Sequence, residues 1–303
     1  MSMPVTPFLP LLRAALLIAA ITVLAFLCIG AVPGDVVDVL ALQGDLTTEQ
    51  QEALRAELGV GRPLPERFWL WLSAALNGDL GASLRFNKPV AELIGTALPL
   101  TLKLAALSFA IGFALAFGVA VGAVVLPNSP LPWLVQAINV WSIAVPTFCV
   151  GIAAILVFSI WLGWMPAIGN LLVPALILAL NLAGELVKAL HDELREQQAG
   201  PHVRAARARG VSGLRIGLVH VLPGAVPVLL ALSSVTLAGL LGGSLTMEVL
   251  FGLPGIGSLT LNAVHGRDWP LLQAVVVLLA AGVVLINAAA DLLQRLLDPR
   301  PRR

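Results

Sequence analysis

A run of 81 residues, from Leu104 to Gly184, contains no aspartate, glutamate, lysine or arginine. Such a run does not fit a soluble domain, in which about a quarter of all residues are charged. Across the whole chain of 303 residues, 58% are hydrophobic and only 12% are charged. The sequence therefore has the composition of an integral membrane protein, whose apolar side chains face lipid.

The charge-free run is too long for one or two membrane helices, because about 20 apolar residues cross a bilayer. Segments rich in proline, glycine and asparagine at 127–132 and 161–170 divide it into three spans. With the other apolar stretches, we expect an all-α protein with six transmembrane helices. These lie at about 14–33, 98–126, 133–160, 171–190, 226–247 and 269–290.

The basic residues predict the orientation, since lysine and arginine gather on the cytoplasmic side. With both termini inside, the inner segments carry 11 basic residues and the outer segments carry six. We therefore predict cytoplasmic termini. The chain divides into an N-terminal span at 1–33, an outer loop region at 34–95, a five-span core at 96–293 and a cytoplasmic tail at 294–303. The loop region contains a predicted helix that begins at Thr47 or Thr48 and ends at Gly59.

The sequence has no ATP-binding loop, which requires glycine, lysine and then serine or threonine. Its three lysines follow Asn87, Leu102 and Val187, so any ATP must bind to another chain. An intramembrane hydrolase is a second hypothesis, but the metal and aspartyl protease motifs are absent and Ser212 lies in a basic loop. A secondary transporter is a third, but it would usually show two related halves, which we do not find.

A basic segment between spans four and five gives the strongest functional signal. Pro201 can begin a short helix that carries three arginines, and Gly210 ends it. A second short helix is expected from Ser212 to about Leu222. Such a helix–turn–helix can dock in the groove of another protein, or it can rest on anionic lipid.

This segment resembles the EAA loop of permease subunits in binding-protein-dependent ABC importers. Arg204 to Ala206 fill the EAA position, Gly210 is the glycine, and His220 to Pro223 fill the I-x-L-P position. Arg204 replaces glutamate and His220 replaces isoleucine. Further segments resemble the peptide/nickel branch of these permeases: Gly78–Leu84, Val145–Phe148, Leu162–Gly169, Gly242–Gly257 and Arg267–Gln273.

The resemblance implies a permease of a type I importer in the bacterial inner membrane, with region 34–95 in the periplasm. Its partners would be a second, homologous permease, two ATPases that bind ATP and magnesium, a periplasmic binding protein and membrane lipid. It implies no catalytic residue, cofactor or metal in this chain, and the net charge of +1 gives no reason to expect nucleic acid. The coupling loop would be 191–225, with contacts from Arg204, Ala205, Ala206, Arg207, Gly210, Ser212, His220 and Pro223.

Polar residues inside the spans are candidates for the solute path: Asn139, Ser142, Asn181, Ser233 and Ser234. Each can instead hydrogen-bond helices together. Glu248 either caps the turn at 254–257 or contacts solute, and Glu185 lies near a span end, where ion pairing suffices. The solute would be a di- or oligopeptide, or nickel or a metal chelate. The compact turn from Trp164 to Pro174 favours the nickel-type relatives.

Overall fold

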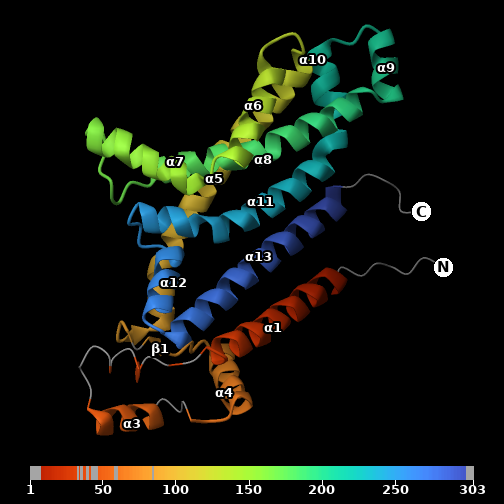
Figure 1. The fold of residues 1–303 in the computed structure, drawn as a ribbon. Coiled ribbons are helices and arrows are strands. Elements are labelled where there is room, and N and C mark those ends of the chain that lie inside the picture. The colour runs from red at the N-terminus through yellow and green to blue at the C-terminus, as the bar shows by residue number, and fades with distance from the viewer. Residues whose placement is uncertain are drawn as a thin grey trace, which may run out of the picture. The chain divides into compact units, whose positions relative to one another are not determined.

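The computed structural model describes residues 8–297 except 33, 35–36, 39–40, 42–46, 58–60 and 84. Within these residues, five helices are long and apolar enough to cross a membrane, and the count is six if one bent pair of helices forms a single span. This confirms the all-α membrane fold. The chain forms two compact units, which divide at residues 10/11, 101/102, 253/254 and 284/285. Figure 1 labels many of their helices along the chain. The predicted end of the loop helix at Gly59 and both chain termini lie outside the described residues.

The unit formed by 11–101 and 254–284 contains the outer loop region. Its elements are α1 (Phe8–Gly30), α3 (Thr48–Glu57), α4 (Leu64–Leu76), β1 (Ala82–Ser83), β2 (Lys88–Pro89), the start of α5 (Val90–Val125), α12 (Ile256–His265) and the start of α13 (Trp269–Leu297). Strands β1 and β2 pair antiparallel, with Ser83 opposite Lys88. The core joins three helices, since Val90 and Ile94 of α5 pack with Ile256 of α12 and Leu271 of α13.

The predicted start of α3 is correct, because Thr47 and Gln50 cap the helix reciprocally. The backbone nitrogen of Gln50 donates to Thr47 Oγ1 at 3.3 Å, and that of Thr47 donates to Gln50 Oε1 at 2.8 Å. This pairing satisfies two donors at the start of the helix. Helix α12, by contrast, was not predicted: sequence analysis placed only a short turn at 254–257 before span six.

The second unit contains most of the spans. Its elements are the rest of α5, α6 (Leu131–Ala144), α7 (Thr147–Ala154), the π-helix η1 (Ile155–Trp161), α8 (Leu172–Gln198), α9 (Pro201–Ala208), α10 (Gly213–Arg215), the π-helix η2 (Ile216–Val221), α11 (Leu222–Leu250) and the end of α13. Helix α8 contacts α6, α7 and α11. Its buried leucines recur every fourth residue, at 178, 182, 186, 190 and 194, and so form one stripe along the helix.

The straight span expected at 133–160 is instead two helices. Helix α6 ends at Ala144, α7 begins at Thr147, and the two are bent by 92°. Val145 has φ −116° and ψ 111°, an extended conformation. The ring of Pro146 disfavours helical geometry in the residue before it, which explains the break.

Candidate coupling loop and solute path

Helix α9 has one buried side and one exposed side. Val203 and Ala206 have no exposed surface, and α9 packs on η2. Arg204, Ala205 and Arg207 are exposed. Pro201 occupies the first helical position after Gly200, as predicted, where its missing N–H removes no helical bond. The arginines thus lie on a face that the other described residues leave open.

Gly210 ends α9 in the left-handed conformation, with φ +76°. Its N–H donates to the Arg207 carbonyl at 2.9 Å, and the N–H of Val211 donates to the Ala206 carbonyl at 3.3 Å. These two bonds form a Schellman motif, which satisfies carbonyls that the helix end leaves unpaired. The predicted stop at Gly210 therefore has a defined geometry.

Ser212 precedes α10 in an extended conformation, at the predicted cap position. In the described structure, however, its side chain makes no capping hydrogen bond. The second short helix expected at 212–222 is also not separate, because α10, η2 and α11 follow one another without a break. The wide π turn of η2 precedes Pro223 and accommodates a proline ring that would collide with the carbonyl four residues earlier.

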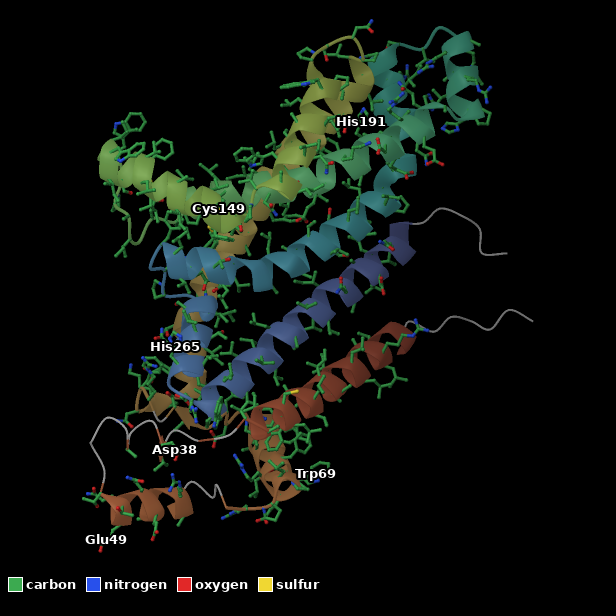
Figure 2. All side chains as sticks on the ribbon, viewed as in Figure 1. Asp38, Glu49, Trp69, Cys149, His191 and His265 are labelled. Atoms are coloured by element: carbon green, nitrogen blue, oxygen red, sulfur yellow. The ribbon has the colours of Figure 1, made fainter. Side chains whose placement is uncertain are left out.

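The loop is held firmly to the two spans that it connects. The imidazole Nε2 of His202 lies 3.2 Å from the carbonyl oxygen of His220, which joins α9 to η2. Helix α8 also contacts η2, and Gly224 of α11 lies against the side chain of Gln197. Figure 2 labels His191, a buried residue in the last third of α8, close to this junction. Helix α9 is therefore connected through η2 to both α8 and α11.

Two of the polar span residues lie where α6 meets α8, and one of them bonds the two helices together. The side-chain amide of Asn139 in α6 donates to the Gly184 carbonyl of α8 at 2.9 Å, and the Ser142 hydroxyl donates to the Asn139 carbonyl at 2.8 Å. A Cβ on Gly184 would lie 2.2 Å from the side chain of Ser142. These contacts bring α6 and α8 together closely.

Asn181 has a different environment from the other polar span residues. Its amide donates to Glu185 Oε1 at 3.1 Å, and both residues line a groove of about 310 Å³ between α7, α8 and α11. Ser234 donates to the Ala231 carbonyl at 2.8 Å, and the Ser233 hydroxyl is buried without a partner among the described residues. Asn181 therefore lines this groove together with an acidic side chain.

Glu248 is fully buried near the end of α11. Its carbonyl accepts from the Leu253 N–H at 2.7 Å, and its carboxylate lies 3.4 Å from the Ser244 hydroxyl. Gly252 turns the chain with φ +59° directly after the helix. The burial of Glu248 and its bond to Leu253 favour a structural role for it at the turn after α11 over contact with solute.

The family model for binding-protein-dependent transport system inner membrane components matches residues 112–303. The chain belongs to this family. The permease is 32% identical over 295 residues to a protein of Brucella abortus (strain 2308) described as a peptide transport system permease. The match covers 93% of this chain and 94% of the relative. It is 33% identical to the glutathione transport system permease protein GsiC of Escherichia coli O6:H1 (strain CFT073), over 93% and 94% of the two chains.

Solved structures give the same fold. An inward-facing form of the MetNI methionine ABC transporter matches the permease with a TM-score of 0.60 and 25% identity, over 68% of this chain and 96% of that chain. A second crystal form matches with a TM-score of 0.57 and 24% identity. The permease is therefore a multi-pass inner membrane subunit of an ABC importer.

Sequence reasoning did not include Glu185 among the solute-path candidates. It was placed near a span end, where ion pairing suffices, and it is the fourteenth of the 27 residues of α8. The lysine one turn away, Lys188, is engaged with Asp192 at 2.5 Å. The spacing from Asn181 to Glu185, one helical turn, was the signal in the sequence that could have shown a polar face.

Proposed function

We propose that this permease is one of two such subunits in an ATP-driven importer of peptides. A homologous permease would complete the pathway, and a periplasmic binding protein would deliver the solute. Two ATPase subunits would bind ATP and magnesium. The observation that carries the peptide assignment is the match of 31–32% identity over most of the chain to relatives described as peptide permeases. Glutathione, which the name of GsiC specifies, is itself a peptide-like solute.

The structure adds no support for the nickel alternative. Among the described residues, no group of three or more histidine, cysteine, aspartate and glutamate side chains could hold a metal ion. The compact turn at 164–174 that favoured nickel begins at exposed Trp164 and closely follows exposed Trp161, and both side chains suit a membrane interface. Import of nickel is therefore the alternative result that the uptake experiment can distinguish.

We further propose that the exposed face of α9 docks on an ATPase subunit. Buried Val203 and Ala206 hold the helix to η2, so Arg204 and Arg207 are left for a partner. Anionic lipid is the other surface that such arginines could contact. The rigid junction with α8 and α11 favours the ATPase, because a lipid contact needs no mechanical connection to the spans.

In this mechanism, closure of the ATPases upon ATP binding pushes α9. The Schellman turn and the contacts of η2 transmit the displacement to α8 and α11. The spans then rotate as rigid bodies and open the pathway alternately to the two sides. The chain itself performs no covalent chemistry in this proposal, and its termini would lie in the cytoplasm.

The test is uptake by proteoliposomes that contain the complete importer, with its binding protein outside and ATP inside. We expect ATP-dependent uptake of a labelled dipeptide or of glutathione. Import of a nickel chelate without import of any peptide would contradict the substrate assignment. For the docking surface, a photo-crosslinker at exposed Ala205 should capture the ATPase, whereas one at Gln50 of the outer loop should not. Capture of lipid alone at Ala205 would contradict docking.

A further inference from the structure

Glu185 is the first charged residue of α8 and directly follows its apolar part. It lies about 20 Å along α8 from Leu172, at 1.5 Å per residue, and three residues before Lys188. Among the described residues, no lysine, arginine or histidine forms an ion pair with it. Its recorded partner is the amide of Asn181, at 3.1 Å.

The side of α8 that carries Glu185 cannot face lipid without a large cost. Glu185 is exposed on the single chain. An ionised group within a bilayer almost always faces protein or a water-filled cavity, because hydrocarbon solvates charge poorly. The groove beside Glu185 is therefore covered by water or by another subunit in the assembled importer.

The groove has polar side chains from all three helices set among aliphatic ones. Thr147 of α7 and Thr236 of α11 line it together with Asn181 and Glu185. Its other wall contains Gly239 and Gly243, and a Cβ at either would meet no described atom within 4 Å. Three helices thus leave an open space, lined by one acidic, three neutral polar and four aliphatic side chains.

We propose that this groove is a stretch of the solute path and that Glu185 binds the ammonium group of the transported solute. The inference rests on the proposed function, since a peptide with a free N-terminus supplies that ammonium group. The Asn181 amide nitrogen is directed to Glu185, so its oxygen and the threonine hydroxyls are left to accept hydrogen bonds. An ammonium group has three donors and no acceptor, which matches this set.

Cysteine reactivity in the assembled importer tests the groove without knowledge of the solute. Cys28 and Cys149 are exposed and are first replaced by alanine. A cysteine is then placed at Gly239, where the space is open, or at Gly118 of α5, a matched control outside the groove whose Cβ would also meet no described atom within 4 Å. Each variant is treated with a cationic and with an anionic methanethiosulfonate reagent.

For the cysteine at 239, we expect the ratio of the reaction rates with the cationic and the anionic reagent to be about ten times the ratio for a free thiol in solution. The reason is that one acidic group nearby raises the local concentration of cations. Glu185→Gln, which keeps the shape, should abolish this preference. The cysteine at 118 should react slowly with both reagents. Equal reactivity at 239 and 118, or a preference that survives Glu185→Gln, would overturn the proposal. So would a cysteine at 239 that reacts only in the isolated permease, since the second permease would then fill the groove.

Uptake then tests the ammonium site. Glu185→Gln should lower uptake of a free-amine dipeptide by about tenfold, the scale of one charge-assisted contact, and leave uptake of its N-acetylated form unchanged. Glu185→Asp, which keeps the charge, should restore part of the free-amine dipeptide uptake that Glu185→Gln loses. An equal loss of uptake for both peptides would overturn the assignment of Glu185 as the ammonium site. If the wild-type importer takes up no peptide, the proposed function fails, and the cysteine reactivity still decides whether the groove is a cation-selective path.

Discussion

The hydroxyl of Ser83 donates a 2.5 Å hydrogen bond to Oδ2 of Asp268, although 185 residues separate the two in the chain. Both side chains are buried. The same carboxylate accepts from the backbone nitrogens of Arg85 and Leu271, each at 3.4 Å. One buried carboxylate therefore joins the β1–β2 hairpin to the first turn of α13 and caps that helix.

Ser83→Ala should destabilise the unit that contains the outer loop. Loss of this bond removes a charge-assisted contact from a buried carboxylate, at a cost of about 1–3 kcal/mol. We expect a lower melting temperature of the detergent-purified permease. Ser73→Ala is the control, because its exposed hydroxyl donates to the Leu70 carbonyl within α4. A Ser83→Ala melting temperature equal to that of the control would show that the bond does not stabilise this unit.

Gly184→Ala should disturb the packing of α6 on α8. The new Cβ would lie 2.2 Å from the Ser142 side chain and 2.8 Å from the Ile138 carbonyl oxygen. Overpacking of this kind costs about 1–3 kcal/mol. Removal of the opposing side chain in Gly184→Ala/Ser142→Gly should restore part of the lost melting temperature. Gly118→Ala, at a glycine with open space, is the control. An unchanged melting temperature for Gly184→Ala would contradict the close approach.

The sequence predicts the spans well because charge is excluded from lipid over long stretches. What the sequence does not predict is the local backbone geometry within a span. Val145–Pro146 was recognised as part of a family motif, but the charge-free pattern around it is the same for a straight and for a bent span. The proline ring decides between them. The continuation of η2 into α11 past Pro223 was missed for the converse reason, since a π turn can accommodate a proline that usually ends a helix.

Contacts between distant segments could not be predicted from one sequence. The segments around Ser83 and Asp268 were both singled out as motifs, but nothing in either shows that they meet. In the candidate path, Asn139 and Asn181 look alike in the sequence, since each is an amide in an apolar span. Only the structure separates them, because Asn139 bonds to the Gly184 backbone and Asn181 lines a groove with Glu185.

The orientation of the permease stays a prediction, and it follows from the 11 inner and six outer basic residues. A cysteine at Arg303 should be protected from a membrane-impermeant maleimide in intact spheroplasts, whereas one at Gln50 should be labelled. Permeabilised cells, in which both positions should react, provide the control, and Cys28 and Cys149 are replaced beforehand. Labelling at 303 without labelling at 50 in intact spheroplasts would reverse the topology.

The last prediction concerns Gly210, whose φ of +76° is the turning point between α9 and α10. A side chain in this conformation costs roughly 1 kcal/mol or more in backbone strain. Gly210→Val should relieve that strain by tilting α9 away from the orientation that the Schellman bonds fix. Because the described chain has no atom within 4 Å of the new Cβ, the membrane spans should insert and melt normally.

Gly213→Val is the matched control, since Gly213 has equal space and no positive φ. In the reconstituted importer, Gly210→Val should lose substrate-stimulated ATPase activity and Gly213→Val should retain it. Wild-type transport by Gly210→Val would show that this turn does not couple ATP hydrolysis to the spans.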